Sequence, residues 1–531
     1  MIPSKRTRLG ELCSLVILAV ATTSLVAQSP AFNPSKLPVV ATIDERFQSY
    51  NIEMVEVTGG RFWKPYGSSS TSADAANQSK PSAGTPTGLN ADLFQYRPPI
   101  DLANRRLRKL ATALGPAYVR VSGSWANNVY FHDSDAPPPA NAPSGFGAVL
   151  TRPEWKSVIY FAHDANADIV TSFAISSGTR DANGVWTTEQ AGKILAYTKS
   201  TRGHIAAIEF MNEPNLPGFG SAPKGYDAKA YARDLAIFEP FLKQNSPGTL
   251  LLGPGSTAEG AHNQPPAIPG ILTTEDLMTA IGPAFDIFDY HLYAAVSQRC
   301  ANRSPERQIT AGDALSADWL SRPQAINTFY SNLRDRFEPG TPIWITETAD
   351  TACGGNPWAS TFRDTFRYVV EHAELARAGV KVVMHNTLAA SDYGLLDQKT
   401  FQPRPNYWGA LLWRTLMGTT VLDPQLPKTE NVYTYAHCMR EHPGGVVLLV
   451  VNADQERPYH IELPLAAERY TLSATTLDQT GVKLDGSQLA LGNHDEIPQL
   501  KGKAIHKGPI GFESKTITFL AIPDANNAAC R

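Results

Sequence analysis

Eight short apolar stretches alternate with longer segments of helical period between residues 50 and 415, and this alternation restricts the possible folds more than any other feature of the chain. The segments between the stretches, such as YDAKAYARDLAIFEPFLKQ, repeat apolar residues at intervals of three and four and carry Gly or Pro at their ends. The stretches are rich in β-branched and aromatic residues, and we predict strands at 50–57, 117–123, 168–176, 205–213, 249–255, 285–293, 342–348 and 380–388.

Eight strand-and-helix units within roughly 250 to 400 residues predict the α/β class and a (β/α)8 TIM barrel. An open, doubly wound sheet is the competing arrangement. No predicted strand is followed by a G-x-G-x-x-G turn or a P-loop, so the barrel is favoured.

The pattern changes after the barrel. Residues 430–523 contain short alternating strands separated by Gly, Pro and Asn turns, which predicts a β-sandwich. We therefore assign residues 50–415 to a catalytic barrel and residues 416–531 to a β-sandwich domain. Residues 28–49 form an N-terminal segment that could join the sandwich.

The N-terminus has the layout of a secretory signal peptide, which we place at residues 1–27. Lys5, Arg6 and Arg8 precede an apolar run from Leu12 to Ala27. A single membrane anchor is the less favoured alternative, because a spanning helix needs about 20 apolar residues. No later segment is apolar for long enough to cross a bilayer, so we predict a secreted or periplasmic protein with no membrane contact after cleavage.

Composition and cysteine spacing bear on the partners. The net charge of −3 indicates no overall basic field, so no nucleic-acid partner is expected. Four cysteines follow the signal, and an exported chain permits disulfides among them in three possible pairings: Cys300, Cys353, Cys438 and Cys530. None lies in a CxxC motif or a Cys/His cluster with metal-ligand spacing, so we predict neither a metal site nor a cofactor.

Two glutamates are the candidate catalytic residues. The stretch AAIEFMNEPN places Glu213 at the end of the fourth predicted strand, and Glu347 ends the seventh. Chemistry in TIM barrels occurs where the strands end, so both carboxyls should meet at one rim. Hydrolysis of a glycoside with retention needs two carboxyls about 5 to 5.5 Å apart, against roughly 6.5 to 9.5 Å for inversion. Burial and a neighbouring negative charge would raise the pKa of the one that acts as the acid.

Either glutamate alone could be a polar strand end that bonds loop amides. Taken together the two favour catalysis, since Asn212 is placed to donate to a sugar hydroxyl and Pro214 stiffens the turn.

Asn-Glu after strand four and Glu at the end of strand seven resemble the retaining glycosidases of the large TIM-barrel clan. Within that clan, the chain resembles the heparanase and β-glucuronidase family, glycoside hydrolase family 79, from YNIEM to the final cysteine. The resemblance implies that Glu213 is the acid/base and Glu347 the nucleophile. It also implies a glycan substrate that contains glucuronic acid.

Further motifs carry the resemblance into the sugar pocket. ETADTACGGNP resembles the loop whose two glycines donate N–H groups to a uronate carboxylate, and AASDYGLLD resembles the stretch that adds a tyrosine. DYHLY resembles a motif that lines the −1 pocket, and SYNIEM places an acid near the far hydroxyls or, alternatively, on the surface. The implied substrate-binding residues are Gly354, Gly355, Tyr393, His291, Tyr293 and Glu53. Tyr293 should donate to the nucleophile.

The resemblance also bears on the cysteines. YAHCMR and the terminal AAC resemble the family's cysteine pair, which implies Cys438–Cys530 and leaves Cys300–Cys353 to join the loops after strands six and seven. Such a bridge would stiffen the loop implied to bind the uronate.

The chain departs from mammalian heparanase in two ways. A short Pro/Ala segment stands where heparanase has an excised linker, so proteolytic activation is not expected. Dense Lys/Arg runs beside the rim are missing, which weakens the case for heparan sulfate.

A neutral-sugar glycosidase and a non-catalytic glycan-binding protein are the alternatives to a β-glucuronidase. Both exo and endo cleavage, and any oligomeric state, remain compatible with the sequence.

Overall fold

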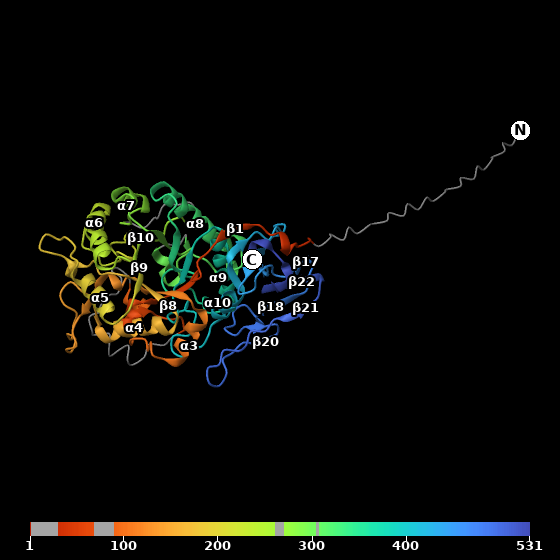
Figure 1. The fold of residues 1–531 in the computed structure, drawn as a ribbon, viewed down its shortest axis with the longest axis horizontal. Coiled ribbons are helices and arrows are strands. Elements are labelled where there is room, and N and C mark those ends of the chain that lie inside the picture. The colour runs from red at the N-terminus through yellow and green to blue at the C-terminus, as the bar shows by residue number, and fades with distance from the viewer. Residues whose placement is uncertain (2–29, 68–89, 261–269, 304–306) are drawn as a thin grey trace.

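The computed structural model of the chain describes residue 1 and residues 30–67, 90–260, 270–303 and 307–531. The predicted signal peptide at 1–27 lies, apart from Met1, outside the described residues. A barrel of strands and helices stands beside a smaller sheet domain formed by the C-terminal part of the chain (Figure 1). None of the helices in the described residues is both long and apolar enough to cross a membrane.

The barrel is closed and parallel, as predicted, with each strand paired to its neighbours in chain order. Its strands are β2 (Gln48–Glu53), β5 (Ala117–Ser122), β8 (Ala167–Ser172), β9 (Ile205–Glu209), β10 (Leu250–Ser256), β11 (Ile287–Leu292), β12 (Ile343–Thr348) and β13 (Val382–His385). All side chains of β2, β11, β12 and β13 are buried, because barrel strands are covered on both faces.

Helices follow the strands and form the outer layer: α3 (Arg105–Leu114), α4 (Arg152–Asp164), α5 (Glu189–Ser200), α6 (Ala228–Asn245), α7 (Thr274–Ile281), α8 (Ala317–Phe337), α9 (Phe362–Arg377) and α10 (Pro405–Leu416). Local sequence sets where several of them begin. At the start of α4, the Thr151 side chain accepts from the backbone N–H of Glu154, and the Glu154 carboxylate accepts from the N–H of Thr151, which is a capping box.

Several predicted strands are too long, among them those at 50–57, 168–176, 205–213 and 380–388. The strand predicted at 50–57 ends at Glu53, where helix α1 (Met54–Thr58) begins, because the Glu56 carboxylate accepts from the Glu53 N–H in a capping box. The strand predicted at 205–213 ends at Glu209. Beyond it, the Asn127 side chain bonds both the N–H and the C=O of Asn212, so a side chain replaces a neighbouring strand there.

Two short pairings lie outside the barrel sheet. Strand β3 (Gly60–Trp63) pairs antiparallel with β4 (Phe94–Arg97), and β6 (Val129–His132) pairs parallel with β7 (Ala148–Thr151). The β3–β4 pair carries Trp63 to the rim of the barrel, where this side chain lines the cavity described below.

The C-terminal domain has two antiparallel sheets. The large sheet contains β14 (Met417–Leu422), β15 (Val432–Met439), β16 (Val446–Asn452), β23 (Thr516–Ile522), β18 (Ala467–Ser473), β19 (Lys483–Leu484), β20 (Ser487–Gln488) and β21 (Lys503–Ile505). The small sheet pairs β17 (Tyr459–Leu463) with β22 (Gly508–Phe512). Leu448 of the large sheet shares one apolar core with Ile461 and Phe512 of the small one.

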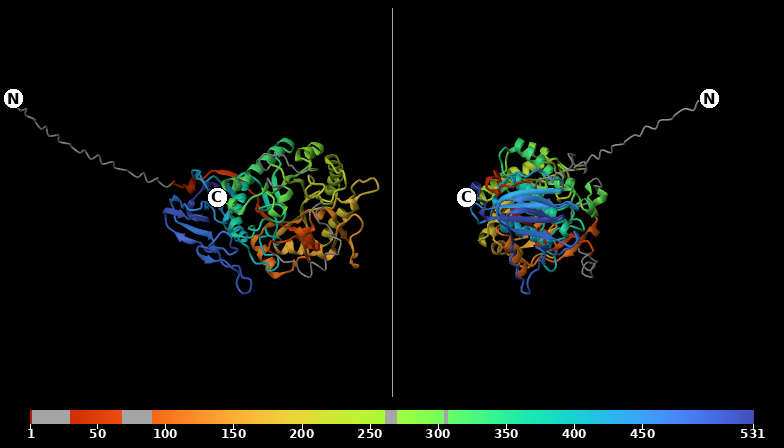
Figure 2. Two further views of the ribbon diagram at one scale, coloured as in Figure 1. Left: turned by 180° about the vertical axis from the view of Figure 1, so that it is seen from behind. Right: turned by 90° about the vertical axis from the view of Figure 1, so that its right-hand side faces the viewer.

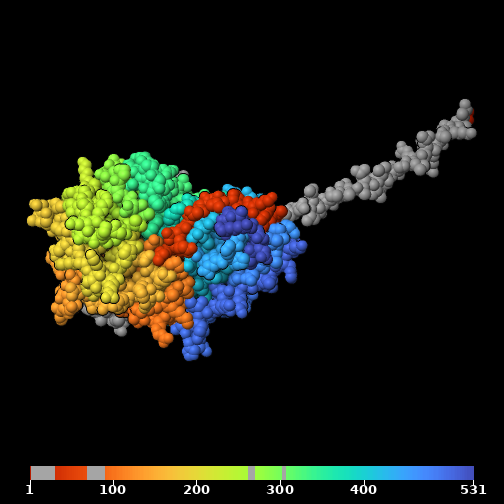
Figure 3. All heavy atoms as spheres, in the orientation of Figure 1, coloured from red at the N-terminus to blue at the C-terminus, as the bar shows by residue number. Residues whose placement is uncertain are grey.

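The N-terminal segment belongs to this domain in space. Strand β1 (Val39–Thr42) pairs antiparallel with β14 and forms one edge of the large sheet. Figure 3 shows this segment, in red, lying against the C-terminal domain, in blue.

The large sheet packs against the barrel. Its Leu449 and Phe519 share the core of the barrel helices, and the Tyr435 hydroxyl donates to Glu374 on α9 at 2.7 Å. The two further views in Figure 2 show the sheet domain on one side of the barrel.

Candidate active site

A cavity of about 180 Å³ opens at the carboxyl ends of the barrel strands, where TIM barrels carry their chemistry. Six of the predicted catalytic and substrate-binding residues line it: Glu53, Asn212, Glu213, Tyr293, Glu347 and Tyr393. They come from β2, β12 and the loops after β9, β11 and β13, so elements far apart in sequence converge on one space.

The two predicted catalytic carboxyls face each other across this space. One carboxylate oxygen of Glu213, one of Glu347 and one ring nitrogen of His291 lie within 4.8 Å of one another. That separation is below the roughly 6.5 to 9.5 Å that leaves room for a water between two carboxyls. The geometry therefore suits direct attack by one carboxylate while the other handles a proton.

Glu347 is held by three donors. The Tyr293 hydroxyl donates to Oε1 at 2.6 Å, as predicted, and Asn386 Nδ2 donates to the same oxygen at 3.2 Å. Arg120 Nη1 donates to Oε2 at 2.9 Å. These bonds hold the carboxylate in one orientation at the end of β12, where a nucleophile needs a defined direction of approach.

Glu213 lies in the loop after β9 and has a backbone φ of 49°, in the left-handed region. A non-glycine residue there costs roughly 1 to 3 kcal/mol and needs support from its surroundings. The Asn127 bonds to Asn212 and the bond from the Leu216 N–H to the Glu213 carbonyl supply that support. The side chain meets His291 Nδ1 at 3.0 Å.

Arg120 links the site together, and sequence reasoning missed it. Its guanidinium is fully buried on β5 and donates to Glu209 at 2.6 Å, to Glu347 at 2.9 Å and to Asn212 at 2.8 Å. Burial alone would lower the pKa of Arg120, but the charges of Glu209 and Glu347 raise it above its usual value. An arginine in the middle of the apolar stretch AYVRVSG was the available signal, since a buried charge requires partners.

Positive charge inside the barrel comes from His291 as well as Arg120. Burial alone would lower the pKa of His291, but the charge of Glu347 and hydrogen bonds to Glu209 and Glu213 raise it to about 10. Burial would raise the pKa of Glu209, but the charges of Arg120 and His291 lower it well below its usual value.

Two groups in the site have donor atoms of the kind that bind metals. They are Glu209 with Asp289 and His291, and Glu213 with His291 and Glu347. A divalent ion in either group would have to compete with the guanidinium of Arg120, which already binds both Glu209 and Glu347, and with a protonated His291. The positive charges of the Arg120 and His291 side chains therefore suit these carboxylates better than a metal ion would.

Asn386 joins the remaining side chains, and sequence reasoning missed it too. Its Nδ2 lies 3.1 Å from Glu53 Oε1 and 3.3 Å from the Tyr393 hydroxyl, in addition to its contact with Glu347. Glu53 is buried and lines the cavity, so the surface alternative is wrong. Burial and the charge of Glu347 raise the pKa of Glu53 well above its usual value.

Gly123 makes room for Glu53. A Cβ at position 123 would lie 1.6 Å from Glu53 Oε2, and the φ of Gly123 is 88°. Any larger residue at this position would displace the carboxyl from the cavity.

Gly354 and Gly355 follow the lining residue Cys353 in the sequence and are not among the described residues that line the cavity. Both have positive φ, at 80° and 84°. Their carbonyls accept from the hydroxyls of Ser391 and Ser297, at 2.8 and 2.7 Å. Their predicted donation to a uronate carboxylate stays a prediction.

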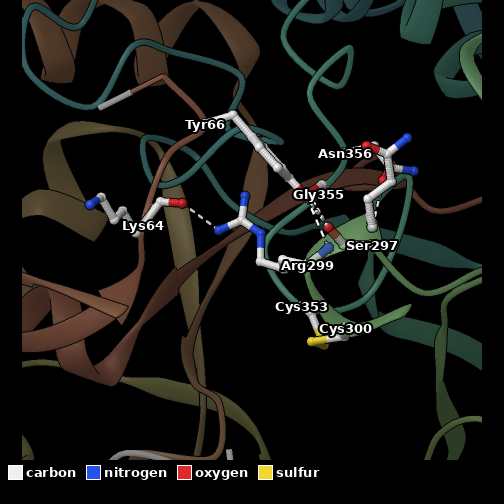
Figure 4. The surroundings of a disulfide bond; sticks show 9 residues. Lys64, Tyr66, Ser297, Arg299, Cys300, Cys353, Gly355 and Asn356 are labelled. Atoms are coloured by element: carbon white, nitrogen blue, oxygen red, sulfur yellow. Dashed lines mark hydrogen bonds between the residues drawn. A yellow bond between two sulfur atoms is a disulfide. The ribbon is translucent and has the colours of Figure 1, made fainter. Parts of the chain in front are cut away.

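Both implied disulfides are present. Cys300 pairs with Cys353, and Cys438 pairs with Cys530. The first joins the loops after β11 and β12 and lines the cavity, as Figure 4 shows for its surroundings. The second joins the C-terminal residues to the end of β15.

Several further lining residues were not predicted. They are mostly apolar or aromatic and include Trp63, Trp125, Leu216, Phe219 and the cationic Arg307. Apart from Trp63 on β3, these residues come from loops, where single-sequence patterns carry little information about spatial neighbours.

No family model matches the chain. Among curated proteins, it is similar to heparanase-like protein 2 of Arabidopsis thaliana, with 24% identity over 66% of this chain and 65% of that protein. Heparanase of Bos taurus is 25% identical over 81% of this chain and 86% of its own length. Baicalin-beta-D-glucuronidase of Scutellaria baicalensis is 26% identical over 76% of this chain and 79% of its own.

Solved structures agree on the fold. The 4-O-alpha-L-rhamnosyl-beta-D-glucuronidase of Fusarium oxysporum superposes with a TM-score of 0.61 at 14% identity, covering 93% of this chain and all of that one. Taken together, the sequence matches and the barrel support a glycoside hydrolase similar to the heparanases and β-glucuronidases.

Proposed function

We propose that the chain is a secreted retaining β-glucuronidase that hydrolyses β-glucuronide bonds in polysaccharides or glycoconjugates. One observation carries the proposal: an oxygen of Glu213 and an oxygen of Glu347 lie within 4.8 Å of each other in the cavity. This distance suits a double displacement better than the insertion of a water between the two groups.

In the first step, Glu347 attacks the anomeric carbon while Glu213 transfers its proton to the departing glycosidic oxygen. The bond to the leaving group breaks as an ester bond forms between the sugar and Glu347. Arg120, Tyr293 and Asn386 orient the attacking carboxylate. In the second step, Glu213 takes a proton from a water that attacks the same carbon, and Glu347 leaves as a carboxylate.

Neutral hydrogen-bond donors favour a uronic acid as the glycone. Burial raises the pKa of Tyr393 well above its usual value, with a further contribution from the charges of Glu53 and Glu347, so the phenol keeps its proton. The Tyr393 hydroxyl accepts from Asn386 and can donate into the cavity. A protonated phenol can bind a sugar carboxylate without competing for Glu347 as a cation would.

Export is supported by two features. The predicted signal peptide directs the chain out of the cytoplasm, and two disulfides are typical of proteins that mature in an oxidising compartment. The physiological partner would be an extracellular or periplasmic glycan that contains glucuronic acid.

The test is hydrolysis of p-nitrophenyl β-glucuronide compared with the matching xyloside, with Glu347→Gln as the inactive control. Preferential hydrolysis of the glucuronide supports the proposal, and the released sugar should first appear as the β-anomer. Preference for the xyloside would identify a neutral-sugar glycosidase. Binding of both without turnover would identify a non-catalytic glycan-binding protein.

A further inference from the structure

At one end of the cavity, strand β3 and the loops after β12 and β13 pack against one another and form a wall. Glu213 marks the leaving-group side, because the acid must reach the glycosidic oxygen. Two lining residues lie near Glu213: the Leu216 N–H donates to the Glu213 carbonyl, and the Asn215 side chain bonds the backbone of Thr257. Glu53 and Tyr393 instead share the donor Asn386 on the Glu347 side, and we take this side as the glycone end.

The wall at the glycone end is tightly packed. A Cβ at Gly354 would lie 2.5 Å from Trp63 Cβ, so the loop after β12 is in direct contact with strand β3. Ser391 Oγ donates to the Gly354 carbonyl at 2.8 Å, which joins the loop after β13 to the same point. A Cβ at Gly355 would lie 3.2 Å from the Tyr393 nitrogen. These contacts hold strand β3 and the loops after β12 and β13 together at this end of the cavity, among the residues that the structure describes.

Arg299 braces this wall through its contacts with Lys64 and Tyr66, and Figure 4 shows these residues together with the Cys300–Cys353 disulfide. Its guanidinium lies 4.1 Å from the centre of the Tyr66 ring, and Nη2 pairs with Asp392 at 2.7 Å. Nη1 donates to the Lys64 carbonyl. The Arg299 and Asp392 side chains are only 7% and 9% exposed, so water screens their attraction little.

Tyr66 completes the brace. Its hydroxyl lies 2.9 Å from Ser297 Oγ, and its backbone N–H donates to Asp392 at 3.2 Å. Ser297 in turn donates to the Gly355 carbonyl at 2.7 Å. Residues after β3, β11, β12 and β13 are thus connected next to the Cys300–Cys353 disulfide.

We propose that the cavity is a pocket for one terminal sugar, so that the protein removes glucuronic acid from the non-reducing end of a glycan. We further infer that Arg299 is a positioning residue that holds the closing wall. This inference rests on the proposed glucuronidase function and names its mode of attack.

The first test compares two substrates. One is p-nitrophenyl β-glucuronide, and the other is the same glycoside with a further sugar on the 4-hydroxyl of its glucuronic acid. A pocket should lower kcat/KM for the second substrate by about 100-fold or more, because the added sugar meets the wall. Cleavage of both at similar rates would overturn the pocket while leaving the glucuronidase function intact. Cleavage of neither would overturn the function itself, and the pocket proposal with it.

The second test compares two arginine variants. Arg180 provides the matched control, because it also lies over a tyrosine ring, that of Tyr226, and pairs with a buried carboxylate, that of Asp234, away from the cavity lining. Arg299→Ala should raise KM for p-nitrophenyl β-glucuronide about 10-fold, with kcat changed less than about threefold, since the catalytic pair stays in place. Arg299→Ala should also reduce the difference in kcat/KM between the two substrates. Arg180→Ala should leave KM and this difference in kcat/KM unchanged.

Equal effects of the two variants, or an unchanged KM in Arg299→Ala, would overturn the role of Arg299. Arg299→Lys should give an intermediate KM, because lysine keeps the charge opposite Asp392 but loses the planar stacking on Tyr66. If Arg299→Ala fails to fold, Tyr66→Phe removes only the hydroxyl that contacts Ser297. It should raise KM in the same direction by about threefold, and an unchanged KM in that variant would equally overturn the brace.

Discussion

Two buried arginines in this barrel have similar surroundings and different consequences. Arg120 and Arg367 are almost fully buried, and each bonds two carboxylates. The partners of Arg367 are Asp364 and Glu371, one turn away on the same helix α9. The partners of Arg120 come from β9 and β12, and one of them is exposed to a cavity.

The difference shows what converts a buried ion cluster into a reactive site. In both clusters, the carboxylates outweigh burial and raise the pKa of the arginine. Both carboxylates of the Arg367 cluster come from its own helix, with Thr348 and Asn406 as further donors, and the cluster is buried away from the cavity lining. The Arg120 cluster lies at the strand ends, so its carboxylate Glu347 lines the cavity, where the proposed reaction requires it.

The largest expected effect separates Glu347 from its counterpart Glu371. Glu347→Gln should lower kcat on the order of 10⁴-fold, because the nucleophile is lost. Glu371→Gln should leave kcat nearly unchanged and lower the apparent Tm. Steady-state kinetics and thermal unfolding of both variants measure the contrast, and a similar loss of kcat in the two would contradict the assignment of Glu347.

Chemical rescue sharpens this first contrast. Azide should restore turnover in Glu347→Ala and yield a glycosyl azide of inverted, α configuration, because the small anion attacks from the face that the glutamate vacated. The product's anomeric configuration is read by NMR. A lack of rescue would count against a covalent intermediate.

The second largest effect on kcat should come from substitutions of the two arginines. Arg120→Met should lower kcat about 10²- to 10³-fold, because Glu347 loses the donor that orients it. Arg367→Met should keep kcat within a few-fold and destabilise the fold by about 3 to 5 kcal/mol, because Asp364 is left buried without its cation. If Arg367→Met lost activity as strongly as Arg120→Met at a temperature where both are folded, the two clusters would not differ in role.

The two disulfides extend the comparison to the loops. Each closes a long loop, with sequence separations of 53 and 92 residues, so removing either should cost roughly 3 to 5 kcal/mol in the chain-entropy view. The double serine variant of Cys300 and Cys353 should in addition raise KM about 10-fold, because it loosens the cavity wall. The double variant of Cys438 and Cys530 should not change KM. An increase in KM in that variant would contradict the different roles assigned to the two disulfides.

Substitutions of tyrosines near the two clusters should differ in their effect on kcat/KM, by a smaller amount than the variants above. Tyr393→Phe should lower kcat/KM for a glucuronide about 10-fold and leave a neutral glucoside less affected, because a hydrogen bond to a charged group is lost. Tyr368 lies beside Arg367 in the sequence and is equally buried, so Tyr368→Phe is the control and should change neither substrate. Equal losses of kcat/KM on both sugars in Tyr393→Phe would contradict the assignment of Tyr393 to the carboxylate of the substrate.

Histidines near the two clusters should differ in the pH dependence of stability. The pKa of His291 is raised to about 10, mainly by Glu347 against the effect of burial, so its stabilising contribution is complete below pH 6.5 and lost as pH rises toward 10. Burial lowers the pKa of His372 to about 3, so its contribution is present above pH 6.5 and lost as pH falls toward 3.

Asn variants separate these two contributions. His291→Asn should flatten the alkaline limb of unfolding free energy against pH, and His372→Asn the acid limb, each by up to about 1.4 kcal/mol per pH unit. Denaturant unfolding across this range measures both limbs. A steeper alkaline limb in His291→Asn would contradict the sign of the shift.

The sequence predicted the features that depend on local pattern. Eight apolar runs with helical segments between them predicted the closed barrel, and strand ends predicted Glu213 and Glu347 at one rim. The family motifs added Tyr293, whose bond to Glu347 the structure confirms, and both disulfides.

What the sequence did not predict depends on spatial convergence. Arg120, Glu209 and Asn386 look like isolated polar residues in apolar runs, and only the closed barrel shows that they share partners. The brace of Arg299, Tyr66 and Asp392 joins residues from three loops. The loop that carries Glu213 begins earlier than predicted, because a distant side chain, Asn127, takes the place of strand pairing.

Strand β1 has a consequence for how this protein can be divided. It forms the edge of a sheet whose other strands begin at residue 417, and Asn527 ties Pro34 and Leu37 to the last residues of the chain. A gene fragment that starts after the barrel would encode a sheet whose β14 exposes unpaired backbone groups, and such an edge invites aggregation. The two domains are therefore interleaved parts of one covalent unit, and neither can be shuffled or excised at a single cut.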